Sequence, residues 1–156
     1  MGRYSYKAAL GILKGYAISE GFKKISFDGS YSYIKWNLHD LYKPDVLCIE
    51  VGKVEDQVYL MLHELGHHEL RKNWVRFEEC LPVIAYAEEV KLNERETKYT
   101  RRDSYIVGSL EEEFMAWSEG LRLGSLMGIR INMQHWIELK SRCLKAYIVY
   151  YANLAK

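Results

Sequence analysis

The residues best suited to chemistry in this chain are His63, Glu64 and His67, which form the pattern H-E-x-x-H. Residues four positions apart lie on the same face of an α-helix, so the two imidazoles could bind one metal ion. Glu64 follows the first histidine and would not take a coordination position. Its carboxylate could therefore act as the general base on a zinc-bound water. The motif predicts a zinc-dependent hydrolase.

The segment around the motif is typical of an amphipathic helix. From Val54 to Arg71 there is no proline, and the only glycine is inside the motif. Apolar residues recur at helical spacing and would bury one flank, namely Val58, Met61, Leu62 and Leu65. His68 is one position further round the helix, so we expect it to be solvated or to support a ligand. The alternative hypothesis is that both motif histidines are hydrogen-bonded helix residues without a metal.

A catalytic zinc needs a third protein ligand. Candidates outside the motif are several carboxylates, His39 and His135. The best candidate is Glu113, because small residues continue its helical face, namely Ala116, Gly120 and Gly124. That face would let its helix approach the motif helix closely. Successive helix positions rotate by about 100°, so we expect Glu111 and Glu112 to form a solvated N-terminal turn instead.

Together, the motif and the pattern E-x-x-A-W at residues 113–117 resemble the ImmA/IrrE-type metallopeptidases, small relatives of the gluzincins. In that family a short sheet precedes the H-E-x-x-H helix, and a later helix supplies a glutamate ligand. The resemblance implies that His63, His67 and Glu113 bind zinc and that Glu64 is the catalytic carboxylate. It covers about the middle two-thirds of the chain.

The chain departs from the family pattern at two places. The family often has Asn or Asp where Trp117 stands, in a position that supports a histidine ligand. A charged segment from Lys91 to Asp103 also lengthens the stretch between the two motifs.

Composition favours one cytoplasmic enzyme domain spanning residues 1–156. With 156 residues, of which 49% are hydrophobic, the chain can bury one substantial core. The 22 basic residues balance 21 acidic ones, so charge gives no argument for nucleic acid or an anionic membrane as partner. Three cysteines without a C-x-x-C pair indicate a reducing compartment, and we interpret them as small buried hydrophobes: Cys48, Cys80 and Cys143. We find no signal-peptide pattern and no apolar run of about 18 residues.

The pattern of elements predicts an α+β fold, with a small antiparallel three-stranded sheet packed against a mainly helical zincin-like domain. A helix from Tyr4 to Glu20 should end at Gly21. Strands at Lys24 to Phe27 and Tyr31 to Asn37 flank an Asp-Gly step, which is typical of a hairpin. A third strand is expected from Val46 to Val51.

Helices and a loop are predicted after the motif. The segment from Trp74 to Leu92 should form one or two helices, with a kink or a new start at Pro82. The charged segment from Asn93 to Asp103 is expected to be a mobile surface loop, and a solvated connector is a more natural interpretation than a substrate lid. A final helix from Met133 to Leu154 carries an apolar stripe that should pack on the core.

These features predict a zinc metallopeptidase that hydrolyses a protein or peptide, whose extended backbone could pair with a strand beside the metal. Tyr150, Tyr151 or His135 could donate a hydrogen bond to the developing oxyanion. Two other classes stay open: a catalytically silent metal-binding domain that regulates by binding proteins, and a nucleic-acid-associated module. The first is favoured by Trp117 and disfavoured by Glu64, because a structural zinc needs no general base. The second would require a clustered basic face.

Overall fold

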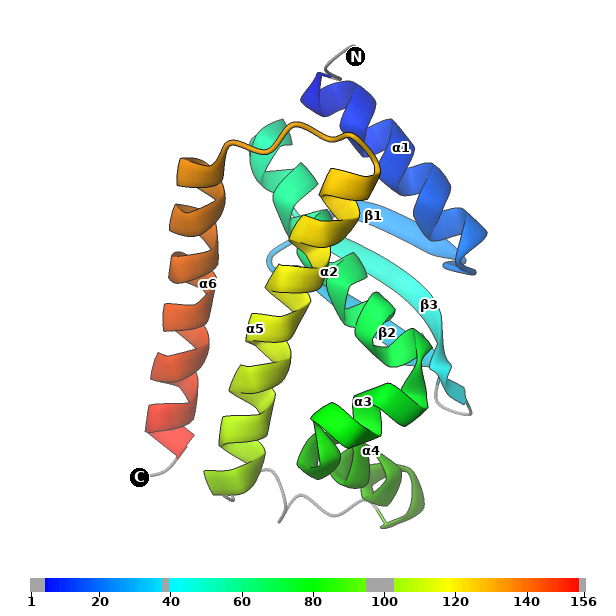
Figure 1. Ribbon diagram of the computed structural model, residues 1–156, viewed down its shortest axis with the longest axis vertical. Helices are drawn as coiled ribbons and strands as arrows, with labels where there is room; N and C mark the ends of the chain where they lie inside the picture. Colours follow the sequence, from blue (N-terminus) through cyan, green and yellow to red (C-terminus); the bar gives the residue numbers. More distant parts are fainter. Residues whose placement is uncertain (1–4, 38–39, 95–102, 155–156) are drawn as a thin grey trace.

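The computed structural model describes residues 5–37, 40–94 and 103–154 (Figure 1). The elements are, in chain order, α1 (Tyr6–Ser19), β1 (Lys24–Gly29), β2 (Tyr33–Asn37), β3 (Asp40–Glu50), α2 (Val54–Lys72), α3 (Trp74–Cys80), α4 (Pro82–Glu94), α5 (Asp103–Leu126) and α6 (Met133–Leu154). The predicted α+β class is confirmed, and Pro82 begins a new helix. Most of the predicted loop at 93–103, together with His39, lies outside the described residues.

The sheet is mixed, so the prediction of an antiparallel sheet with a β1–β2 hairpin was wrong. Strand β3 lies in the middle, parallel to β1 and antiparallel to β2. The side chains of Leu47 and Ile49 in β3 are completely buried, as is typical of a strand in the middle of a sheet. The Asp-Gly step instead ends β1, and residues 30–32 carry the chain across the end of β3, where the backbone N–H of Glu50 donates to Ser32 Oγ at 3.0 Å. A Cβ on Gly29 would lie 2.6 Å from Cys48 Sγ, so this glycine permits a close approach.

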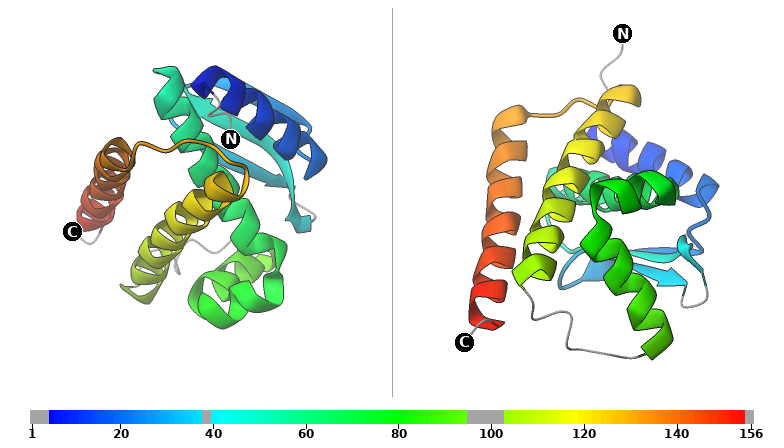
Figure 2. Two further views of the ribbon diagram at one scale, coloured as in Figure 1. Left: turned by 45° about the horizontal axis from the view of Figure 1, so that its top comes forward. Right: turned by 60° about the horizontal axis from the view of Figure 1, so that its bottom comes forward.

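Helix α2 lies between the sheet and α5, and it also packs against α1 (Figures 1 and 2). Its apolar residues are completely buried on several sides of the helix, including Val58, Met61, Leu62 and Leu65. They join Leu13 of α1 and Leu47 of β3 in one core cluster. A helix buried to this degree holds its polar side chains in fixed positions, which is what a binding site requires.

Local signals define the ends of several helices. Ser5 caps α1 by accepting from the Ala8 N–H, and Asn73 caps α3 by accepting from the Arg76 N–H. The chain turns between α5 and α6 at Gly128, whose φ of 68° favours glycine. Helices α5 and α6 then run side by side in both views (Figures 1 and 2).

Helix α6 packs on the core through only part of its predicted stripe. Trp136 and Leu139 are buried, as expected, whereas Tyr150 is 58% exposed. Tyr147 is half-buried and lines a cleft described below. The carboxyl half of α6 therefore borders an opening and does not cover the core.

The cysteines follow the prediction only in part. Cys48 is buried in β3 and Cys143 is half-buried in α6, but Cys80 is exposed. The error has a local cause, because Cys80 is the last residue of the short helix α3 and the core-facing position there is taken by Phe77.

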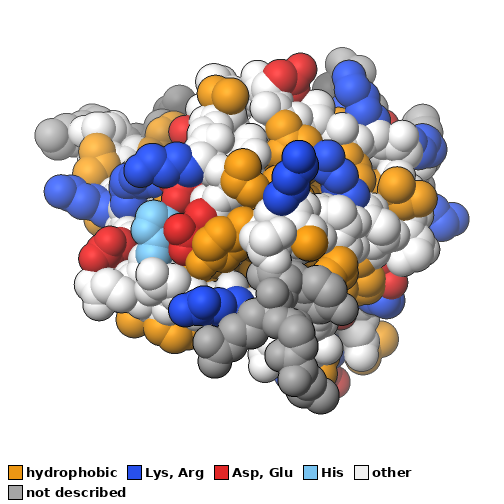
Figure 3. All heavy atoms as spheres, turned by 90° about the horizontal axis from the view of Figure 1, so that it is seen from above, with side chains coloured by type: hydrophobic (Ala, Val, Ile, Leu, Met, Phe, Trp, Pro, Cys, Tyr) orange, Lys and Arg blue, Asp and Glu red, His pale blue; other side chains and the backbone are white. Residues whose placement is uncertain are grey.

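Two features of the described residues concern the membrane and nucleic-acid interpretations. Across the part of the chain that the structure describes, no helix is both long and apolar enough to cross a membrane. On the face shown in Figure 3, Lys and Arg side chains are separated from one another by apolar and acidic side chains. That face presents no continuous basic stripe among the described residues.

Candidate metal centre

Helix α2 presents the three motif residues from within the core. His63 is 3% exposed and Glu64 is 6% exposed, while His67 is half-buried and opens onto a cleft. The imidazole centroids of the two histidines are 4.8 Å apart. This arrangement is the one that the spacing of four residues predicts for a helix.

Glu113 of α5 lies between the two imidazoles, as predicted. Its Oε2 is 3.2 Å from His63 Nε2, and its Oε1 is 3.5 Å from His67 Nε2. One ligand atom from each of the three residues lies within 4.8 Å of the others. Two imidazole nitrogens and a carboxylate oxygen form a donor set that zinc accepts.

Small residues create the close crossing of α2 and α5 that brings Glu113 to the histidines. A Cβ on Gly120 would lie 2.4 Å from the Leu62 carbonyl oxygen, and one on Gly66 would lie 2.0 Å from that of Ala116. Both distances are too short for any side chain. The predicted face of Ala116 and Gly120 therefore meets α2, and the glycine inside the motif is its counterpart on the other helix.

His63 Nε2 and Glu113 Oε2 face each other in a way that suits a shared cation. Burial lowers the pKa of His63 to about 4, against the opposing effect of Glu113, so the imidazole is neutral at pH 7. Its Nε2 faces Glu113 Oε2 at 3.2 Å, but that oxygen receives no hydrogen bond. In the tautomer with the proton on Nδ1, this nitrogen and the carboxylate oxygen both present lone pairs, which a shared metal ion would satisfy.

Glu112 corrects one prediction. It was expected in a solvated N-terminal turn with Glu111, but only Glu111 is exposed. Glu112 is 7% exposed, because α5 already begins at Asp103 and this residue faces α2. Its Oε1 lies 3.1 Å from His67 Nδ1. An N–H at that nitrogen donates to Glu112 and leaves Nε2 free to bind a metal.

Arg71, one helical turn after His67, holds Glu112 in place. Its Nε and Nη2 donate to Glu112 Oε1 at 3.1 Å and 2.9 Å. Burial raises the pKa of Glu112, but the Arg71 guanidinium and His67 together outweigh burial, and the net effect lowers the pKa to about 2. The guanidinium also lies over the rings of Trp36 and Phe77, at 5.1 Å and 5.0 Å from their centroids. Sequence spacing could have indicated this residue, because positions 67 and 71 share a helix face.

Trp117 occupies the place where the resembled family often has Asn or Asp, and it contacts His63 in a different way. The indole stacks on the imidazole, with centroids 4.4 Å apart and an angle of 19° between the planes. His63 Nδ1 has no hydrogen-bond partner. The orientation of His63 is thus set by packing, whereas that of His67 is set by a hydrogen bond.

A cleft of about 230 Å³ opens beside the three ligands. Glu64, His67 and Glu113 line it from the helices. Ser32, Tyr33, Ile34 and Trp36 line it from β2 and the turn before it. Because β2 is at the edge of the sheet, it can pair with another extended chain on the side away from β3. Burial raises the pKa of Glu64 to about 8, so without a metal this carboxyl is largely protonated at pH 7.

Tyr147 of α6 also lines the cleft, and no feature of the sequence assigned it to the site. Its hydroxyl lies within hydrogen-bonding reach of Glu113, and burial together with Glu113 and Glu64 raises its pKa. Tyr151 also lines the cleft, but Tyr150 does not. No signal in the sequence separates these tyrosines, because all three are on the same terminal helix.

His135, a predicted candidate for both the third ligand and the oxyanion donor, is not in the cleft. Its Nε2 contacts Asp56 Oδ1 at 2.5 Å, near the start of α2. His135 and Tyr147 are about three turns apart on α6. His135 is near the start of the helix, away from the cleft, and Tyr147 is in the half that lines the cleft.

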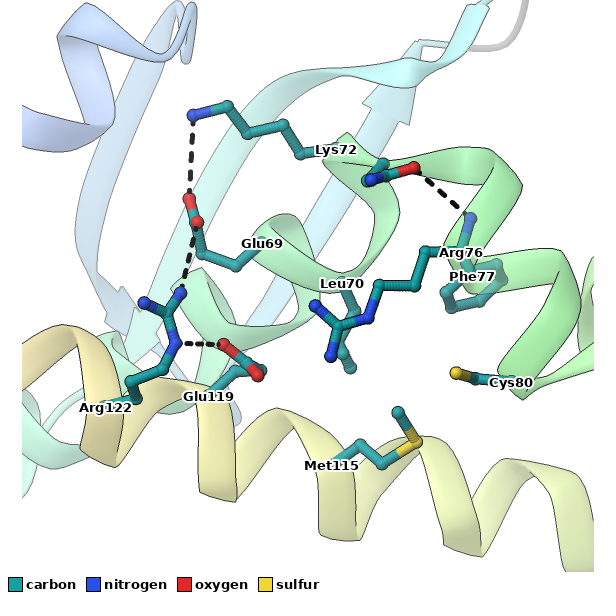
Figure 4. A pocket seen from close by; sticks show the side chains of 10 residues that line it. Glu69, Leu70, Lys72, Arg76, Phe77, Cys80, Met115, Glu119 and Arg122 are labelled. Carbon is teal, nitrogen blue, oxygen red and sulfur yellow. Dashed lines mark hydrogen bonds and ion pairs between the residues drawn. The ribbon is translucent and has the colours of Figure 1, made fainter.

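His68 is buried, so the expectation that it is solvated was wrong. It is not part of the candidate metal group formed by His63, His67 and Glu113. Its Nε2 lies 3.0 Å from Glu20 Oε2. Glu20, His68 and Glu69 form a second group that could hold a cation. Lys72 Nζ already lies 2.7 Å from Glu20, and Arg122 lies 3.7 Å from Glu69. Figure 4 shows the ion pairs of Glu69 with Lys72 and Arg122 at a pocket between α2, α3 and α5. We interpret this second group as an ion-pair network.

Comparison of the chain with known protein families, with curated proteins and with solved structures finds no match.

Proposed function

We propose that this protein is a zinc-dependent metallopeptidase that hydrolyses peptide bonds in a protein substrate. One observation carries the proposal: the buried carboxyl of Glu64 lines the same cleft as His67 and Glu113, whose ligand atoms converge with that of His63. A site that only stored or displayed a metal would gain nothing from a buried, solvent-shielded carboxyl beside it. The charge of that carboxyl is costly to bury, so its position favours catalysis.

The chain's own residues would divide the work of hydrolysis. When bound, zinc supplies Lewis acidity to the attacking water and to the scissile carbonyl. Glu64 accepts the proton of that water and passes it to the leaving amine. Tyr147 is positioned to donate a hydrogen bond to the developing oxyanion. Glu112 fixes the tautomer and the ring orientation of His67.

An extended peptide is the substrate that fits the cleft. The open edge of β2 can form main-chain hydrogen bonds with an extended backbone and hold its carbonyl beside the ligands. The resemblance to ImmA/IrrE-type enzymes supports a regulatory endopeptidase in the cytoplasm, and the free cysteines are consistent with a reducing compartment.

The proposal is tested by measuring metal content and peptide hydrolysis on the same samples. We expect near-stoichiometric zinc in the wild type, and a sharp loss of both zinc and activity in His63→Ala and Glu113→Ala. Glu64→Gln should keep its zinc and lose activity by a factor of about 10² or more. His135→Ala, which changes a histidine outside the cleft, should match the wild type.

Absence of zinc from the wild type after zinc is supplied would overturn the proposal. Bound zinc without hydrolysis of any peptide would favour the alternative, a catalytically silent metal-binding domain that regulates by binding proteins. One observation favours this alternative: Trp117 stacks on His63 and gives it no hydrogen-bonding support.

A further inference from the structure

A second hollow adjoins the cleft at the start of β2. It has a volume of about 580 Å³ and is lined by Tyr31, Ala146, Tyr147 and Tyr150. These residues come from the turn before β2 and from the carboxyl half of α6. Tyr31 is 65% exposed and Tyr150 is 58% exposed, so two large aromatic rings face solvent at one place. Among the residues that the structure describes, no charged side chain lines the hollow.

The hollow continues directly from the cleft through Tyr147, which lines both. The hydroxyl of Tyr147 lies within hydrogen-bonding reach of Glu113, so the hollow begins one side chain away from a candidate metal ligand. The two openings differ in chemistry. The cleft is lined by several charged residues, including Glu64, Arg71 and Glu113, whereas aromatic rings and a methyl group line the hollow.

The direction of β2 determines which part of a substrate would reach the hollow. Strand β2 runs from Tyr33, whose ring lies 5.3 Å from that of Tyr31 in the hollow, toward Trp36, which lines the cleft further along the strand. Antiparallel pairing is slightly more stable per residue than parallel pairing. A peptide paired antiparallel with β2 has its carboxyl-terminal part at the Tyr33 end, and thus at the hollow.

We propose that this hollow, named here the tyrosine subsite, receives an aromatic or large aliphatic side chain of the substrate residue that follows the scissile bond. The proposal rests on the proposed peptidase function. Phenol rings offer edge-to-face and stacking contacts to such a side chain. A charged side chain would lose hydration there without gaining an ionic partner.

The test uses the zinc-loaded full chain and internally quenched peptides that vary only at the residue after the cleaved bond, with cleavage positions read by mass spectrometry. We expect kcat/KM to be at least about tenfold higher for Phe, Tyr or Leu than for Gly, Asp or Lys. Tyr31→Ala and Tyr150→Ala should each lower kcat/KM for the Phe peptide severalfold. Both variants should leave kcat/KM for the Ala peptide within about twofold of the wild type.

Two controls make the result specific to the tyrosine subsite. Tyr86→Ala removes another exposed tyrosine, on α4, which lines neither the cleft nor the hollow, and it should leave the preference unchanged. Zinc content should match the wild type in all three variants, because the altered residues are not candidate ligands.

Hydrolysis with equal rates at all residues would overturn the tyrosine subsite while leaving the peptidase function intact. The same conclusion follows if the preference lies only before the scissile bond, or if Tyr150→Ala slows every peptide equally. Absence of hydrolysis of any peptide would overturn the peptidase function and the subsite together.

Discussion

At the residue scale, the hydrogen bonds from Arg71 to Glu112 and between Glu112 and His67 fix the orientation of a candidate metal ligand. Each of these contacts is short, and both charged residues are buried. A carboxylate that accepts a hydrogen bond from one ring nitrogen of a histidine raises the basicity of the other ring nitrogen. It also selects the tautomer in which that other nitrogen can bind a metal. His63 lacks such a partner, so the two histidines should respond differently to changes around them.

We expect Glu112→Gln to weaken zinc binding by about 10- to 100-fold, because a neutral amide is a poorer acceptor for the His67 N–H. The measurement is competition with a chromophoric chelator. Glu111→Gln is the matched control, since this exposed neighbour is on the same helix. Equal zinc affinity in the two variants would contradict the role assigned to Glu112.

The buried carboxyl of Glu64 predicts a pH dependence of stability in the metal-free protein. Burial raises its pKa from 4.5 to about 8, so between these values the folded chain keeps a proton that the unfolded chain has released. Stability contributed by this group is therefore greatest below the unfolded pKa and declines as the pH rises toward the folded pKa. Glutamine does not titrate and lacks this decline.

We expect metal-free Glu64→Gln to become more stable relative to the wild type as the pH rises from about 5 to about 8, with no further gain above that. Urea unfolding in the presence of a chelator, repeated across this range, measures the difference. If the difference in unfolding free energy between Glu64→Gln and the wild type stays constant with pH, Glu64 is ionised in the folded protein. Glu111→Gln again serves as the control.

At this scale the sequence predicted which side chains converge as candidate metal ligands but not the residues that support them. Helical spacing determines which side chains of one helix share a face, so His63 and His67 followed from the motif alone. Glu112 was missed because two adjacent positions of α5 face α2, and that depends on how closely the helices cross. Tyr147 was missed because its role depends on where the end of α6 lies.

The crossing of α2 and α5 is the element-scale feature that assembles the site. Its two glycines are in helix interiors, where they cost stability relative to alanine in the absence of other contacts. Here they allow backbone-to-backbone contact that no side chain permits. The ligands from the two helices meet only while this contact is kept.

We expect Gly120→Ala to destabilise the protein by about 3 kcal/mol or more, because its Cβ would lie 2.4 Å from the Leu62 carbonyl oxygen. Zinc affinity should fall in the same variant, since Glu113 would move away from His63. Gly15→Ala in α1 is the matched control: no atom outside its own helix lies near the new Cβ, and we expect a gain of about 0.5–1 kcal/mol. Thermal unfolding measures the stability change in both variants. A small loss of stability in Gly120→Ala would mean that α2 and α5 can move apart at their crossing.

The sheet shows what sequence patterns could not determine at the element scale. Strands β1 and β2 were found near their actual positions, because alternating and β-branched residues indicate extended backbone. Strand β3 begins at Asp40, six residues before its predicted start at Val46. The order of the strands was not found, because the Asp-Gly step between β1 and β2 is a local signal and pairing is a non-local one. Burial of Leu47 and Ile49 favours β3 as the central strand, and that preference prevails over the hairpin.

For the whole molecule, the candidate metal centre acts as a cross-link between α2, in the middle of the core, and α5. A ligand that binds only the folded chain stabilises it, by about 2.7 kcal/mol when its concentration is 100 times Kd. For a domain of 156 residues we therefore expect zinc to raise Tm by roughly 5–10 °C over the chelated protein.

This increment should depend on the ligands and not on the catalytic carboxyl. We expect it to vanish in His63→Ala and Glu113→Ala, and to persist in Glu64→Gln, because Glu64 occupies no coordination position. Calorimetry with and without a chelator measures all four proteins. A zinc-dependent rise in Tm that survives His63→Ala would mean that the metal binds elsewhere, and the second acidic group around Glu20 and His68 would then be the site to examine.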